Sequence, residues 1–313
     1  MVRTVAGVRR FPLFTFTFRR IDGRLASVDS FSMKLTSLLL FLLAQFLPAE
    51  EPAAVSAVFT GKGLNVELVS EVTAIRPGQP FHAGLFIRHD PGYHTYWKNP
   101  GLAGVPTNLQ WSLPPGWKAG DIEWPAPDKV MMAQIATHGY ERDVLLMVKL
   151  TPPAKVSEAT VTLQTKASWM CCARVCNPGY CVLALTLPVA AGAEPAWHPV
   201  WHKLFEKERA AFPVPITGWK LSAAKQGKKV ILTGKPEKPG TALPEKPMFF
   251  SSNNLICSHP PQIWQATATG FHAELEMSEL PPKDQSVLRG LLRSKTGWLP
   301  NDHRAAIIEV PVK

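Results

Sequence analysis

The chain has 313 residues and carries 34 basic and 24 acidic side chains, a formal net charge of +10. Seven of the basic and two of the acidic residues precede Glu50, so 34 − 7 = 27 basic and 24 − 2 = 22 acidic residues follow, a net charge of about +5. This modest charge argues against nucleic acid binding, which needs a clustered basic face.

A secretory signal peptide and a short linker are predicted at residues 33–57. Lys34 gives a positive start, residues 38–47 form an apolar run, and Ala49 or Ala57 offers a small residue for cleavage. The run is too short for a membrane span, which needs about 20 apolar residues, and a short buried helix is the alternative interpretation. We therefore expect a protein exported to a compartment in which disulfides persist.

Residues 1–32 are Arg-rich and lie upstream of a better start at Met33. We interpret them as a non-structural extension from an over-extended gene model, or as a long n-region. No stretch after Ala49 has membrane-spanning length, so the mature protein is expected to be soluble, and its 313 − 49 = 264 residues are enough for two modest domains or one large one.

Residues 58–190 are predicted to form strands. Hydrophobic residues alternate with polar ones in several sets, which is the period of strands with one buried face; the sets are Leu64, Val66 and Leu68; Phe81, Ala83, Leu85 and Ile87; Val161, Leu163, Thr165, Ala167 and Trp169; and Leu183, Leu185, Leu187 and Val189. Pro and Gly mark turns between them, as at Asn99-Pro-Gly101. This spacing predicts an all-β chain that begins with a β-sandwich.

A linker and one short amphipathic helix are predicted at residues 191–212, because Trp197, Val200, Trp201, Leu204 and Phe205 fall at helical spacing. Strand patterns resume after Pro213, so residues 213–313 are predicted to be a second, smaller, β-sandwich-like domain. Strands are expected there at Trp219–Ser222 and Val230–Leu232, and residues 225–246 are expected to be mostly loop outside that second short strand.

Five cysteines follow the predicted leader, and four of them lie within eleven residues: Cys171, Cys172, Cys176 and Cys181, with Cys257 apart. Such a cluster can bind a metal, brace the structure or exchange disulfides. Metal is disfavoured because there is no Cys-x-x-Cys pair and because Cys171 and Cys172 would point to opposite faces of a strand. We expect neither a metal nor a cofactor.

A Cys172–Cys176 bond would close a ring of only five residues. The chain-entropy formula gives such a loop about 2 kcal/mol, against nearly 5 for a hundred-residue loop, so this bond is a weak brace and a short ring favours exchange. Cys171 and Cys181, at the ends of successive predicted strands, are candidates for a structural cross-strand disulfide.

Exchange needs an attacking thiolate and a second cysteine that resolves the mixed disulfide. Cys172 and Cys176 meet the second requirement, and Arg174 between them could stabilise a thiolate, although it could equally be a solvated loop charge.

The segment Trp169-Met-Cys-Cys-Ala-Arg-Val-Cys-Asn-Pro178 resembles the Trp-Leu-Val-Cys-x-x-x-Cys-x-Pro segment of the DsbD N-terminal-domain-like family, as found in ScsB-type thiol:disulfide interchange proteins. Further similar segments cover about residues 58–190, namely Pro91-Gly-Tyr-His-Thr-Tyr-Trp-Lys-Asn-Pro-Gly101, Gly104-Val-Pro106, Trp111-Ser-Leu-Pro-Pro-Gly-Trp117, Trp124-Pro-Ala-Pro127 and His138-Gly-Tyr-Glu141.

The resemblance implies an immunoglobulin-like sandwich in the periplasm. Cys172 and Cys176 match the family's redox pair, flanked by Trp169 and Pro178. The pair would take electrons from a membrane electron carrier or a thioredoxin-like protein and pass them to exported thiol or disulfide client proteins. Cys171 and Cys181 depart from the pattern, and the sequence has no transmembrane carrier, so the partners are expected on other chains.

Two other groups are candidates for lining the site. His94, Tyr96 and Trp97, followed by Lys98, could shield the disulfide or contact a partner, or could fill the sandwich edge. His138, Tyr140 and Glu141 could supply a proton or tune a thiol, or could form a hydrogen-bonded turn.

The sequence therefore predicts a thiol–disulfide interchange module, whose enzymatic status it leaves open. The alternative is a non-catalytic β-sandwich that binds or scaffolds a partner and uses its cysteines for stability. The ten Trp residues are expected mainly in core positions rather than on a glycan-binding face.

Overall fold

The structure is a computed structural model that describes residues 57–313 except 193 and 300–302. The predicted extension at 1–32 and the predicted signal peptide lie outside the described residues, apart from Ala57. Among the described residues, no helix is long and apolar enough to cross a membrane.

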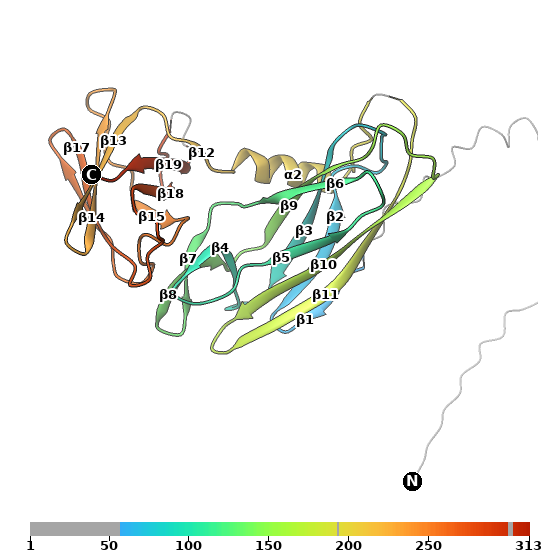
Figure 1. Cartoon of the computed structure of the whole chain (residues 1–313), viewed down its shortest axis with the longest axis horizontal. Helices are drawn as coiled ribbons and strands as arrows, with labels where there is room; N and C mark the ends of the chain where they lie inside the picture. The colour runs from blue at the N-terminus through green and yellow to red at the C-terminus, as the bar shows by residue number, and fades with distance from the viewer. Residues whose placement is uncertain (1–56, 193, 300–302) are drawn as a thin grey trace, which may run out of the picture. The chain divides into compact units, whose positions relative to one another are not determined.

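Residues 57–188 form three antiparallel sheets (Figure 1). The first has the order β1 (Phe59–Gly61), β2 (Leu64–Ser70), β3 (Phe81–His89), β9 (Val144–Thr151) and β6 (Lys118–Glu123). The second has the order β11 (Cys176–Pro188), β10 (Thr160–Cys172) and β5 (Asn108–Ser112). The third has the order β4 (Thr95–Gly101), β8 (Ile135–Tyr140) and β7 (Asp128–Met132).

The first two sheets enclose one hydrophobic core. Leu68 and Leu85 on the first sheet and Leu163 and Leu185 on the second are all buried in it. The alternation read from the sequence is the reason, because every second side chain of a strand points to the same face. The predicted all-β fold is confirmed.

The chain after Pro213 forms two four-stranded sheets. One has the order β12 (Val214–Pro215), β19 (Ala305–Pro311), β18 (Val287–Arg293) and β15 (Met248–Ser251). The other has the order β13 (Trp219–Gln226), β14 (Lys229–Pro236), β17 (Gly270–Glu276) and β16 (Ile263–Thr267). Their separate core contains the aromatic cluster of Trp219, Trp264, Phe271 and Trp298.

The strands expected at Trp219–Ser222 and Val230–Leu232 are present but longer than predicted, so less of residues 225–246 is loop than expected. β13 and β14 form a hairpin in which Gln226 pairs with Lys229, so Gly227 and Lys228 are a two-residue turn. Gly227 has a φ of 59°, the left-handed conformation that such turns need. The lysines near the turn hid the full length of these strands.

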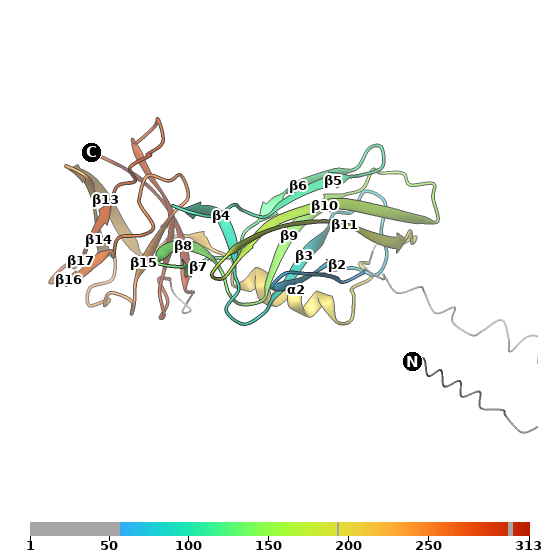
Figure 2. The same ribbon diagram turned by 90° about the horizontal axis from the view of Figure 1, so that it is seen from below.

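The helix α2 (Trp201–Ala210) begins later than the predicted pattern. Trp197 forms a β-bridge with Val72 instead of joining the helix. Phe205 is fully buried against Val69 and Leu145 on the first sheet, and Figure 2 shows the helix lying along β2 and β9.

Side chains of β15 and of the loop after it contact the third sheet. The ring of Phe250 lies 4.9 Å from that of His138, Asn99 Nδ2 donates to the Ser251 carbonyl at 2.6 Å, and Ser258 Oγ donates to the Ala136 carbonyl at 2.8 Å. The predicted turn at Asn99-Pro-Gly101 is an irregular end of β4, where the register with β8 shifts. The domain boundaries near 190 and 213 stay predictions.

Candidate functional site at the end of the long hairpin

Cys172 and Cys176 lie directly opposite each other at the end of the β10–β11 hairpin and are joined by a disulfide. Their Cα atoms are 4.2 Å apart, and a three-residue tip, residues 173–175, connects them. Asn177 Nδ2 donates to the carbonyls of Cys171 and Val175 at 3.2 and 3.1 Å, which fixes the tip. The sequence therefore places a small covalent ring where the sheet ends.

The two faces of this hairpin have different chemistry. Cys171 and Cys181 lie on the face of the hairpin that carries the core side chains. Cys172 and Cys176 lie on the other face, together with Met170 and the exposed Tyr180. Because strand side chains alternate between faces, the bonded and the unbonded cysteines point in opposite directions.

The expected Cys171–Cys181 disulfide is not formed, and both residues are buried free thiols. Cys171 pairs with Asn177 and Cys181 with Ala167. Four residues of β11 separate these positions, a distance of about 13 Å, and a disulfide needs Cα atoms within about 7 Å. The prediction failed because it took Cys181 as the start of β11, which begins at Cys176.

Burial makes both free thiols unreactive. It raises the pKa of Cys171 to about 12, with a further contribution from the charge of Asp90. Burial also raises the pKa of Cys181 to about 11. Since the thiolate is the nucleophile, neither residue can compete with the disulfide in exchange at neutral pH. Cys257 is partly exposed and free.

The end of β10 is covered by the residue that precedes β4. His94 and Cys172 form a two-way β-bridge, in which each backbone N–H donates to the other residue's carbonyl at 2.9 and 3.0 Å. Cys172 is fully buried, whereas Cys176 is half-buried. Cys176 is therefore the more exposed residue of the pair.

His94 and Tyr96 form an uncharged aromatic pair in this cover. His94 Nε2 lies 3.2 Å from the Tyr96 hydroxyl, and their rings meet edge to face. Burial, aided by the nearby charge of His89, lowers the pKa of His94 to about 4. Burial and Cys171 raise the pKa of Tyr96 to about 12. At neutral pH both are uncharged and bring no charge to the disulfide.

The other predicted lining residues lie elsewhere. His138 Nδ1 lies 3.1 Å from the Asn99 carbonyl oxygen and its ring packs on Trp97, while the Tyr140 hydroxyl donates to the Pro125 carbonyl at 2.7 Å. Burial lowers the pKa of His138 to about 4 and raises that of Tyr140 well above its usual value. Glu141 is exposed just after β8.

The flanks of the cysteine motif have distinct places. Trp169 is buried opposite Gly179, where a Cβ atom would lie 2.6 Å from the indole Nε1. Glycine at 179 is therefore what lets the Trp169 ring lie across the hairpin. Pro178 is exposed opposite Met170, and Arg174 is exposed at the tip.

Three exposed apolar side chains at the tip of the hairpin and along β11 were not singled out in the sequence. Val175 at the tip is 70% exposed, and Tyr180 and Val182 on β11 are 68% and 66% exposed. In the sequence, Tyr180 and Val182 alternate with Cys181 and Leu183, and this alternation indicates that they lie on the exposed face of the strand. We call Val175, Tyr180 and Val182 the apolar strip.

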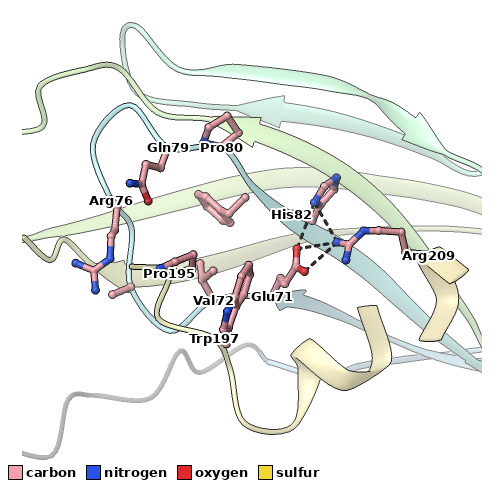
Figure 3. A pocket seen from close by; sticks show the side chains of 11 residues that line it. Glu71, Val72, Arg76, Gln79, Pro80, His82, Pro195, Trp197 and Arg209 are labelled. Atoms are coloured by element: carbon pink, nitrogen blue, oxygen red, sulfur yellow. Dashed lines mark hydrogen bonds and ion pairs between the residues drawn. The ribbon is translucent and has the colours of Figure 1, made fainter. Parts of the chain in front are cut away.

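A buried ion cluster beside α2 was also missed (Figure 3). The Glu71 carboxylate accepts from Arg209 Nη2 at 2.9 Å and lies 3.2 Å from His82 Nδ1. Burial would raise the pKa of Glu71, but the hydrogen bonds from His82 and Arg209 outweigh it and lower the pKa. Bonding to Glu71 raises the pKa of His82. The cluster joins α2 to the first sheet.

Comparisons with known proteins place this site in a family. Residues 63–188 match the family model described as "Thiol:disulfide interchange protein DsbD, N-terminal". The fold is similar to the crystal structure of the N-terminal periplasmic domain of ScsB from Proteus mirabilis, with a TM-score of 0.58 at 17% identity, over 83% of this chain and 99% of that one. None of the curated proteins compared with the sequence matches it. Residues 63–188 of this chain are a domain of the DsbD N-terminal family.

Proposed function

We propose that the chain is an exported thiol–disulfide interchange module that relays electrons through Cys172 and Cys176. The observation that carries this proposal is the disulfide itself, which closes a three-residue tip at the edge of a DsbD-type domain and has Cys176 as its partly exposed member. The predicted signal peptide and the periplasmic origin of the structurally similar ScsB domain support a periplasmic location.

In the proposed reaction a thiolate of a membrane electron carrier or a thioredoxin-like partner attacks Cys176 Sγ. The Cys172–Cys176 bond breaks and Cys172 leaves as a thiolate, which takes a proton from solvent. The partner's second cysteine then attacks the mixed disulfide, so Cys176 is released and the partner is oxidised. The chain has gained two electrons, and it delivers them by the reverse steps to the disulfide of an exported client protein.

The difference in burial supports this assignment of the two cysteines. Cys172 lies under His94 and is fully buried, whereas Cys176 is half-buried beside the apolar strip. A partner that covers the strip would bring its own cysteine to Cys176 rather than to Cys172.

The alternative is a non-catalytic scaffold with a structural disulfide. The uncharged His94–Tyr96 cover favours it, because no charged group of that pair could stabilise a Cys172 thiolate. The weak stabilisation expected from a five-residue ring argues against it.

Trapping experiments with single Cys→Ser substitutions distinguish the interchange module from the scaffold. Cys172→Ser retains Cys176 as a thiol, and the probe is a thioredoxin variant whose one cysteine carries thionitrobenzoate in a mixed disulfide. We expect Cys176 to attack the thioredoxin sulfur and release thionitrobenzoate at least ten times faster than Cys176→Ser does. The control is Cys257→Ser, which keeps both cysteines of the pair. After reduction it should react with the thioredoxin variant as the reduced wild type does. Equal rates for the two variants, or no adduct with either, would contradict the proposal.

A further inference from the structure

A groove opens on the first sandwich, between the edge strands of its two sheets. A cavity of about 600 Å³ lies between β5 and β6, lined by Lys98, Pro106, Thr107, Asn108, Leu109, Trp111, Gly120, Asp121, Ile122, Trp124 and Val148. A second cavity of about 410 Å³ shares Lys98, Ile122 and Trp124 with it and has Trp97 in its wall, while its other side is formed by residues of the C-terminal region, among them Phe212, Ser252, Arg289 and Ile307. We call the two together the edge groove.

Buried polar groups without partners gather in the walls of this groove. Thr107 is 3% and Trp97 1% exposed, and within the described part of the chain neither Thr107 Oγ1 nor Trp97 Nε1 has a hydrogen-bond partner. The indole Nε1 of Trp111 is likewise buried and unpaired there. Buried polar groups are nearly always hydrogen-bonded, so three such groups around one groove indicate a ligand that accepts hydrogen bonds.

The backbone at the groove is also unpaired. β5 pairs only with β10, and β6 only with β9, so each is the edge strand of its sheet among the described residues. The pairing register of β6 with β9 shifts between Ala119 and Ile122, so the ladder is irregular there. An open strand edge can accept an added strand, whose main-chain groups supply affinity while side chains enter pockets.

These observations favour one class of ligand. An extended polypeptide offers carbonyl acceptors for the indole and hydroxyl donors and both donors and acceptors for the strand edges. It can also lay apolar side chains against Trp111 and Trp124. We propose that the edge groove binds an extended polypeptide segment of a client protein.

The position of the groove gives this binding a use. Ser168, opposite Asn108 of β5, is four residues from Cys172 along β10, and Lys98 is four residues from His94, which bridges Cys172. Each distance is about 13 Å at the rise of a strand. About four to six extended residues therefore reach from the groove to the disulfide. This delivery of a client cysteine rests on the proposed function, whereas binding in the groove does not.

Gly120 offers a way to obstruct the groove, because it is part of the cavity wall on the open edge strand β6. A Cβ atom there would have its nearest contacts at 3.5 and 3.8 Å, both with Lys149, and the residue is exposed. Gly120→Trp should therefore place a bulky side chain over the edge of β6 at the rim of the groove without disturbing the fold. Thr186→Trp places the same side chain at an exposed position of β11 and is the matched control.

The test uses fluorescein-labelled, reduced and carboxymethylated α-lactalbumin, which stays unfolded and has no free thiol. We expect fluorescence anisotropy to show binding to the wild type and to Thr186→Trp, and binding at least tenfold weaker to Gly120→Trp. Hydrogen exchange of the wild type should slow at β5 when the probe is added. Because the probe cannot exchange thiols, these results are independent of the redox activity of Cys172 and Cys176.

Absence of binding to the wild type, or equal affinity of Gly120→Trp and the wild type, would overturn the proposal. It would also be overturned if chitohexaose bound in the groove and was blocked by Gly120→Trp while the unfolded chain did not bind, since the groove would then be a glycan site.

Discussion

At the scale of single residues, the face of the strand to which a cysteine points decides whether it can react. Cys171 and Cys172 are neighbours, yet one is a core thiol whose pKa burial raises to about 12 and the other is half of a disulfide. Alternation in the sequence predicted that they face opposite ways. It did not predict the offset of Cys181, because register depends on where the hairpin turns.

A thiol count tests this arrangement. Oxidised protein that lacks the leader, denatured without reductant and treated with iodoacetamide, should take up three alkyl groups, one each at Cys171, Cys181 and Cys257. Mass spectrometry of the intact chain measures the number. Uptake of a single group would mean that Cys171 and Cys181 are bonded after all.

His138 links pH to stability. Burial lowers its pKa to about 4 in the folded protein, against about 6.5 when unfolded. The unfolded state therefore binds a proton first, so the stability that neutral His138 provides is complete above pH 6.5 and is lost as the pH falls from 6.5 towards 4. Burial also lowers the pKa of His94, so the stability that neutral His94 provides is likewise lost as the pH falls.

We expect His138→Gln to reduce the slope of the free energy of unfolding against pH by about 1 kcal/mol per pH unit between pH 6 and 5. Urea unfolding at a series of pH values measures it. His82, whose pKa is raised, adds stability as the pH falls. Because the wild type and His138→Gln both contain His82, its contribution is the same in both slopes and does not affect their difference. An unchanged slope would show that His138 is not kept neutral by burial.

At the scale of elements, strand alternation carried most of the predictable information. The long strands β10 and β11 and the strands β2 and β3 were all visible as alternating sets, because each has one face in the core. β9 was not, because its residues from Val144 to Val148 are all buried. That strand has α2 on one face and the core on the other, so alternation is lost.

The helix α2 was predicted from its spacing, but its attachment was not. Glu71, at 4% side-chain exposure, and Arg209 are 138 residues apart in sequence, and no local pattern links them. Removing one partner of a buried charge pair leaves the other without compensation, which costs several kcal/mol when both are buried.

Because Arg209 is 39% exposed, we expect Glu71→Gln to lower the free energy of unfolding by only about 1–3 kcal/mol. Hydrogen exchange of residues 201–210 should accelerate. Glu206→Gln, on the same helix but 60% exposed, is the control and should leave both quantities nearly unchanged. If the two variants behave alike, the Glu71 cluster does not hold the helix.

At the scale of the whole molecule, the proposed function makes the chain one partner in a relay. A disulfide at the end of a hairpin can accept and donate two electrons, but the proposed source and destination of those electrons are other proteins. The apolar strip beside Cys176 and the edge groove four residues from Cys172 would then serve different partners, one folded and one extended.

The reduction potential of the Cys172–Cys176 disulfide tests the central claim most directly. Equilibration of the oxidised protein in glutathione buffers, followed by alkylation and mass spectrometry, measures it. Structural disulfides in exported proteins have potentials below about −300 mV, and exchangeable ones lie above that value. We predict a potential above about −300 mV, and a value well below it would contradict the account of Cys172 and Cys176 as an electron relay.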